Sequence, residues 1–163
     1  MKAAAAAAVS IRKAIIGDVG RIQALVNHYA SKETMLGLSL SEIYDQIRDF
    51  TVAEGPRRSL IGVCALHVIW DDLAEIRSLA VDPKIRRRGV GRALVVHCIE
   101  EARALRIPKV FALTYQAEFF RQIGFERVEK ADPPHKVWRD CLKCSKFPNC
   151  DETAVLRVLP AQP

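Results

Sequence analysis

The fold of this chain is decided at residues 81–94, which read Val-Asp-Pro-Lys-Ile-Arg-Arg-Arg-Gly-Val-Gly-Arg-Ala-Leu. The stretch follows a strand-like apolar run and opens a helix with apolar periodicity. Its turn holds Gly89 and Gly91 among five basic residues. Glycine lets the backbone approach a ligand closely, and a helix N-terminus carries partial positive charge. The stretch therefore predicts a cradle for a phosphate or pyrophosphate group, with a basic surface turn as the alternative.

The spacing of the glycines excludes two common phosphate-binding motifs. A P-loop needs Gly-x-x-x-x-Gly-Lys-Ser/Thr, which this sequence lacks. A dinucleotide-binding turn needs three glycines, and only Gly89 and Gly91 are present here. The pattern that fits is Arg/Gln-x-x-Gly-x-Gly/Ala, with Arg86 in its first position.

Hydrophobic periodicity along the rest of the chain predicts an alternation of strands and helices. Strands are predicted at residues 9–14, 50–54, 59–69, 73–81, 108–113, 125–128 and 151–159. Helices are predicted at residues 18–28, 39–50, 91–105 and 118–123, and Asp18 is the expected cap of the first. This order predicts one α/β domain, in which a mixed, twisted sheet of about seven strands is flanked by helices.

The length of 163 residues suits one domain with a substantial core. We expect residues 1–8 to be a disordered alanine-rich start, residues 9–159 to form the domain and residues 160–163 to be a tail. Residues 131–150 form a basic, cysteine-containing segment within the domain. No apolar run approaches the ~18 residues that span a bilayer. Because alanine alone makes a poor signal-peptide core, a cytoplasmic location without a membrane partner is favoured.

Three segments of the chain carry a resemblance to a known family. Residues 75–81, the Arg86 loop and residues 119–125 occupy the three motif positions of the GNAT superfamily of N-acetyltransferases, which the chain resembles. More narrowly, residues 74–81, 111–114 and 134–138 are similar to the short, stand-alone amino-acid N-acetyltransferases. Those enzymes are themselves similar to the acetyltransferase domain of N-acetylglutamate synthase, which starts arginine biosynthesis.

The resemblance implies acetyl-CoA as the cosubstrate. Its pantetheine arm would pair with the backbone of Leu79, Ala80 and Val81 like an added strand. Its pyrophosphate would lie over the cradle, formed by Arg86, Arg87, Arg88, Gly89, Val90, Gly91 and Arg92. The amine would then attack the thioester directly in a ternary complex, without a covalent enzyme intermediate. The formal net charge of +6 also suits this polyanionic small molecule better than nucleic acid, since no helix-turn-helix or RNA-recognition pattern accompanies it.

The resemblance also suggests catalytic residues. Glu75 holds the strand position of the family's general base, and the alternative is a surface glutamate paired with Arg77. Many members place a tyrosine where this chain has Phe120, which cannot protonate the leaving thiolate. Thr114 and Tyr115 follow the central strand and are the two candidates for that role, although Tyr115 also suits half-buried packing.

The acceptor of the acetyl group is expected to be a small amino acid, with L-glutamate first. The candidate substrate-binding residues are Met35, Leu36, Arg77, Ser78 and Lys136. Leu38 stands where the glutamate-acetylating relatives have an arginine, so either Lys32, Arg77 or Lys136 replaces that charge, or Met35 and Leu38 line an apolar pocket. Alternatives are another small amine, a protein amino group, or a non-catalytic acyl-CoA-sensing module. A homodimer is a common arrangement in this superfamily.

Five cysteines, an odd number, argue against a disulfide framework. Cys64 and Cys98 lie within apolar patterns and are expected in the core. The remaining three belong to the run Cys141-x-x-Cys144-x5-Cys150. Together with His135 they would make a Cys3His zinc site, and three free thiols are the alternative.

Overall fold

The computed structural model describes residues 9–85, 88–130, 144, 146 and 149–161. Its strands are β1 (Ser10–Lys13), β2 (Phe50–Glu54), β3 (Leu60–Trp70), β4 (Leu73–Val81), β5 (Lys109–Thr114), β6 (Glu126–Val128) and β7 (Thr153–Val158). Its α-helices are α1 (Val19–Ala30), α2 (Leu40–Asp45), α3 (Val90–Ala104) and α4 (Ala117–Arg121). Short 3-10 turns lie at η1 (Ile16–Asp18), η2 (Ile47–Asp49), η3 (Pro56–Arg58) and η4 (Pro83–Ile85).

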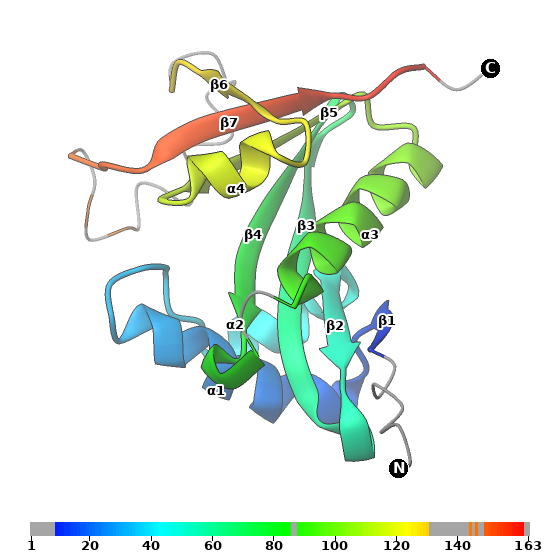
Figure 1. Ribbon diagram of the computed structural model, residues 1–163, viewed down its shortest axis with the longest axis vertical. Coiled ribbons are helices and arrows are strands. Elements are labelled where there is room, and N and C mark those ends of the chain that lie inside the picture. The colour runs from blue at the N-terminus through cyan, green and yellow to red at the C-terminus, as the bar shows by residue number, and fades with distance from the viewer. Residues whose placement is uncertain (1–8, 86–87, 131–143, 145, 147–148, 162–163) are drawn as a thin grey trace, which may run out of the picture. The chain divides into compact units, whose positions relative to one another are not determined.

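The strands form one seven-stranded sheet in the order β1-β2-β3-β4-β5-β7-β6 (Figure 1). β4 and β5 run parallel, whereas β1 with β2, β5 with β7, and β6 with β7 are antiparallel. The parallel pair needs a crossover, and α3 supplies it. The predicted class, a mixed α/β sheet of seven strands flanked by helices, is therefore confirmed.

Two compact units make up the chain, and β3, β4 and α3 each contribute to both. The first unit comprises Met1–Cys64 and Ser78–His97, and the second comprises Ala65–Arg77 and Cys98–Pro163. No helix in the described part of the chain has the length and apolar composition needed to cross a membrane.

The core of the first unit is built on α1. Every third or fourth residue of that helix is buried, namely Val19, Ile22 and Val26, as the periodicity predicted. The helix packs beside α2, whose Ile43 is also fully buried (Figure 1). The predicted helix over residues 39–50 stops early, at Asp45, because Phe50 already accepts a hydrogen bond from Ala14 N–H at the edge of β2.

Asp18 does not cap α1 through its side chain, contrary to the expectation from the sequence. Its fully buried carboxylate instead accepts from Arg12 Nη1 at 2.7 Å, from Arg21 Nη2 at 2.8 Å and from Ile15 N–H at 2.9 Å. Arg12 also donates to Glu54 on β2. This network fastens β1, α1 and β2 to one another.

The core of the second unit surrounds β5. Phe111 is fully buried and packs with Leu73, while α4 lies against β6 and β7 (Figure 1). Gly124 adopts φ +89° shortly after α4, a left-handed conformation that favours glycine at the end of a helix. The N–H of Phe125 then bonds back to the carbonyl of Phe120 at 3.1 Å, which closes the helix end.

Candidate active site

β4 changes its backbone conformation in the middle of the strand. Its parallel pairing with β5 covers Leu73 to Glu75, and the strand continues to Val81. Ser78 has φ +55°, a left-handed conformation that a non-glycine residue adopts only at a cost. This residue interrupts the extended backbone conformation of β4. A left-handed residue inside a strand changes the direction of the backbone groups that follow it.

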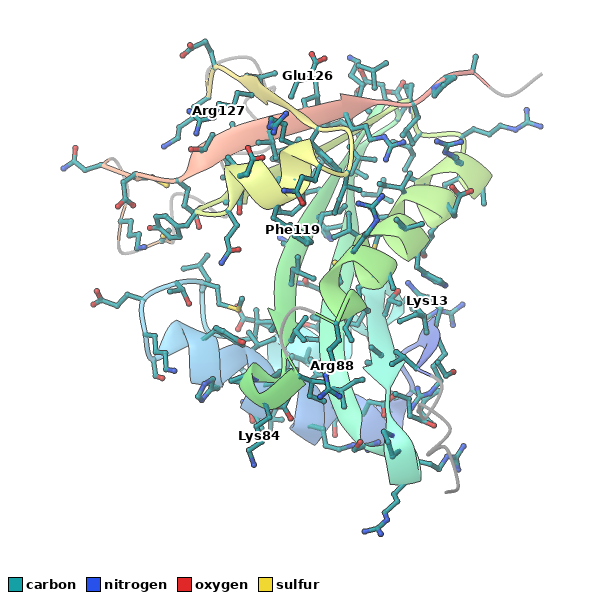
Figure 2. The ribbon with its side chains drawn as sticks, in the orientation of Figure 1. Lys13, Lys84, Arg88, Phe119, Glu126 and Arg127 are labelled. Atoms are coloured by element: carbon teal, nitrogen blue, oxygen red, sulfur yellow. The ribbon has the colours of Figure 1, made fainter. Side chains whose placement is uncertain are left out.

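The cradle lies directly after this strand, in the first unit. Gly89 has φ +77°, and a Cβ there would meet nothing within 4 Å, so its backbone conformation rather than crowding requires glycine. Helical bonding in α3 begins when Ala93 N–H donates to the Gly89 carbonyl at 3.0 Å. Arg88 and Arg92 are exposed, and Figure 2 shows Arg88 and Lys84 beside the turn that leads into α3. A glycine turn followed by a helix N-terminus is thus present where the sequence predicted it, and the binding of an anion there stays a prediction.

Gly62 on β3 determines how closely the start of α3 approaches the sheet. A Cβ at Gly62 would lie 2.9 Å from Leu94 Cδ1 and 3.0 Å from Val90 Cγ1. The first turn of α3 therefore packs against the backbone of β3. No role was predicted for Gly62 from the sequence, although a glycine inside an apolar strand indicates a close approach of another backbone or helix.

Glu75 and Arg77 lie on the second unit's part of β4. Arg77 Nη1 lies 3.8 Å from Glu75 Oε2, and the side chains are 20% and 13% exposed. The ion pair that the sequence offered as the alternative for Glu75 is thus present. It holds the carboxylate half-buried beside a cation, opposite Phe111 of β5.

Thr114 and Tyr115 stand at the end of β5, but their hydroxyl groups have different partners. Thr114 Oγ1 accepts from Gln116 N–H at 2.8 Å, a bond that leaves its own proton to be donated. Tyr115 donates its proton to Asp151 Oδ1 at 2.6 Å and accepts from Lys146 Nζ. The hydrogen bond to Asp151 raises the pKa of Tyr115 above its ordinary value.

Phe120 occupies the position where a tyrosine was expected from the resemblance. Its ring is buried and contacts Phe119 and Phe125 edge-on, with centroids 5.2 and 5.1 Å apart. This part of α4 therefore serves the core and offers no hydroxyl group.

The predicted acceptor loop connects α1 to α2 in the first unit. Within it Met35 is half-buried and Leu36 is half-exposed. Leu38 is held through its backbone, since Asn27 accepts its N–H at 2.9 Å and donates to its carbonyl at 3.1 Å. A capping box then starts α2, because Ser39 and Glu42 exchange hydrogen bonds.

Several predicted site residues lie outside the described residues: Arg86, Arg87, His135, Lys136 and Cys141. Cys144 and Cys150 are half-buried free thiols, and Lys130 Nζ donates to the Cys150 carbonyl at 2.5 Å. Within the described ranges, no group of three or more metal-binding side chains comes together. The zinc site therefore remains a prediction.

The structure distributes the predicted residues over both units. The donor strand from Leu79 to Val81, the cradle and the acceptor loop belong to the first unit. Glu75, Arg77, Thr114 and Tyr115 belong to the second unit.

The family and the individual proteins that this chain matches are acetyltransferases. Residues 25–125 match the acetyltransferase (GNAT) family. The chain is 39% identical over 94% of its length to an uncharacterized N-acetyltransferase, CT2212, of Chlorobaculum tepidum, and the match covers 99% of that protein. It is 41% identical to an amino-acid acetyltransferase of Mycobacterium tuberculosis, over 73% of this chain and 69% of the relative.

A solved structure also resembles the chain. N-acetylglutamate synthase from Neisseria gonorrhoeae, complexed with coenzyme A and N-acetyl-glutamate, superposes with a TM-score of 0.85 at 29% identity. The match covers 94% of this chain and 36% of the synthase chain. The chain thus corresponds to about a third of that larger protein.

Proposed function

This chain belongs to the acetyltransferase (GNAT) family, and from that premise we propose that it transfers the acetyl group of acetyl-CoA to the amino group of a small amino acid, with L-glutamate the first candidate. The donor is the cosubstrate of acetyl transfer in this family. The observation that carries the proposal is the succession of β4 with its left-handed Ser78, the turn at Gly89 and the N-terminus of α3.

The donor would bind along this path in two parts. Past Ser78, the backbone groups of Leu79 to Val81 would pair with the amides of the pantetheine arm, as an added strand does. The pyrophosphate would then meet the N-terminus of α3, where Gly89 turns the chain and Arg88 and Arg92 supply positive charge. Positioning both parts fixes the thioester for attack.

Chemistry at the thioester requires a neutral amine. The Glu75 carboxylate, directly or through a water molecule, would take a proton from the acceptor's ammonium group. The amine nitrogen then attacks the carbonyl carbon and forms the N–C bond, and the C–S bond breaks as the tetrahedral intermediate collapses. Thr114 would donate a hydrogen bond to the departing thiolate, because its O–H is not used in the bond to Gln116, and the thiolate takes up the proton that the attacking nitrogen releases.

The acceptor is supported by the named relatives, which include an amino-acid acetyltransferase and an N-acetylglutamate synthase. Leu38 cannot supply the positive charge that would bind the side-chain carboxylate of a glutamate substrate. Arg77, which lies beside the proposed base Glu75, is a cation that would supply it instead. A different small amine or a protein amino group is the second candidate, because Met35, Leu36 and Leu38 make the acceptor loop apolar.

The test measures thiol release from acetyl-CoA with a panel of free amino acids. We expect turnover with L-glutamate or a close analogue, and a loss of at least about 100-fold in Glu75→Gln, the range that general bases supply. Glu126→Gln, an exposed carboxylate on β6, is the matched control and should keep wild-type activity. Tight coenzyme A binding without turnover of any amine would instead indicate an acyl-CoA-sensing module.

A further inference from the structure

Tyr29 connects two segments of the first unit that are far apart in sequence. It lies in the last turn of α1 and is 8% exposed. Its hydroxyl donates to the carbonyl oxygen of Val81 at 2.5 Å, across 52 positions of the chain. Val81 is the last residue of β4, directly before the turn that leads into the cradle.

The peptide group between Val81 and Asp82 is held from both sides. Its carbonyl accepts from Tyr29, and its N–H donates to the carbonyl of Ile61 on β3 at 2.8 Å. Because a peptide group is planar, fixing both its C=O and its N–H prevents it from rotating. The Asp82 side chain also accepts from Lys84 N–H at 2.9 Å. The residue that supplies the N–H of the fixed peptide group therefore also holds the turn after β4.

Tyr29 also holds the acceptor loop, through its backbone. The carbonyl of Tyr29 accepts from Lys32 N–H at 3.0 Å and from Thr34 Oγ1 at 3.0 Å. Two residues earlier on α1, Asn27 holds the far end of the loop at Leu38. One residue thus bonds to the donor strand through its side chain and to the acceptor loop through its backbone.

We propose that Tyr29 is a positioning residue for acetyl transfer: it orients the last peptide group of the donor strand and couples that strand to the acceptor loop. This inference rests on the proposed binding of coenzyme A along Leu79 to Val81. Tyr29 acts through the peptide group that it holds and takes no part in the chemical steps.

Tyr29→Phe tests the first part, because phenylalanine keeps the ring and removes only the hydroxyl. Isothermal calorimetry with free coenzyme A should give a Kd about fivefold to tenfold weaker, the usual effect of losing one buried hydrogen bond. Tyr44→Phe removes a hydroxyl from a half-exposed tyrosine on α2 and should leave the Kd unchanged. Equal Kd values for the wild type and Tyr29→Phe would overturn the assignment, whereas a wild type that fails to bind coenzyme A would overturn the proposed function instead.

Amide hydrogen exchange tests the coupling and does not depend on activity. In the wild type, coenzyme A should slow exchange at Asp82 and also in the loop from Thr34 to Leu38. In Tyr29→Phe the slowing in the loop should disappear, and Asp82 should exchange several-fold faster even without ligand. A fall in thermal stability with unchanged exchange at both places would show that Tyr29 only stabilises the fold.

Discussion

Thr114 and Tyr115 are adjacent hydroxyl residues whose surroundings separate their chemistry. Tyr115 donates a hydrogen bond to Asp151, and this bond raises the pKa of Tyr115. The hydroxyl proton of Tyr115 is therefore already engaged by the Asp151 carboxylate. Thr114 is buried, and its oxygen accepts from Gln116 N–H, a bond that leaves its O–H able to donate to a ligand. The geometry therefore favours Thr114 as the donor to the thiolate.

Thr114→Val should lower kcat by about 10- to 100-fold, because the departing thiolate loses a positioned hydrogen-bond donor, and a hydrogen bond to a charged group contributes about 1.5–3 kcal/mol. Thr114→Ser keeps the hydroxyl and should recover most of the activity. Tyr115→Phe should lower kcat by less than about threefold. Thiol-release kinetics with each variant measure this, and a larger loss in Tyr115→Phe than in Thr114→Val would reverse the assignment.

Some of these roles could be predicted from the sequence and others could not. Gly89 was predictable because its motif is local: a strand, a basic turn and a helix follow one another within fourteen residues. The partners of Tyr115 were not, because Asp151 and Lys146 lie more than thirty positions away. Tyr29 gave no signal at all, since it fits the apolar face of α1 and its bond to Val81 exists only in the folded chain.

At the scale of elements, the buried Asp18 network joins β1, α1 and β2. Burial works to raise the pKa of Asp18, but the hydrogen bonds from Arg12 and Ile15 outweigh it, and the pKa lies below its ordinary value. A lowered carboxyl pKa stabilises the folded state above the unfolded pKa of about 3.9. This stabilisation is lost as the pH falls through that value towards the folded pKa.

Asp18→Asn should lower the free energy of unfolding at pH 7 by about 3 kcal/mol, because buried charge pairing is broken. Urea unfolding at pH 7, 5 and 3 measures the free energy of unfolding of both proteins. The difference between wild type and variant should become smaller at pH 3. Glu118→Gln breaks the exposed pair with Arg121 and should leave stability almost unchanged. A gap that stays constant down to pH 3 would show that ionisation of Asp18 is not the cause.

The close approach of α3 to β3 depends on Gly62. The sequence pattern could not predict this contact, because it depends on where α3 lies in the folded chain. Gly62→Val should cost about 1–3 kcal/mol, since the new methyl groups overlap Leu94 and Val90. It should also weaken coenzyme A binding, because Val90 directly follows Gly89 in the cradle.

Gly20→Ala is the matched control for Gly62→Val. A Cβ at Gly20 meets nothing within 4 Å, and the residue lies in the first turn of α1. The alanine should therefore stabilise the protein by up to about 1 kcal/mol and leave coenzyme A binding unchanged. Calorimetry with coenzyme A measures the affinity of both variants. If a folded Gly62→Val protein binds coenzyme A with wild-type affinity, the position of α3 against β3 does not determine binding.

At the scale of the whole molecule, the formal net charge of +6 gives a field that attracts a polyanion such as coenzyme A. Salt screens this field, since the Debye length falls from about 10 Å at 0.1 M to about 3 Å at 1 M. The Kd for coenzyme A should therefore rise by about tenfold over that range.

Arg92→Gln should weaken coenzyme A binding at low salt and make the Kd depend less on salt concentration, because it removes charge at the cradle. Lys13→Gln removes the same charge from β1 and should change the Kd much less, so equal effects of the two substitutions would show that overall charge, rather than the cradle, attracts the ligand.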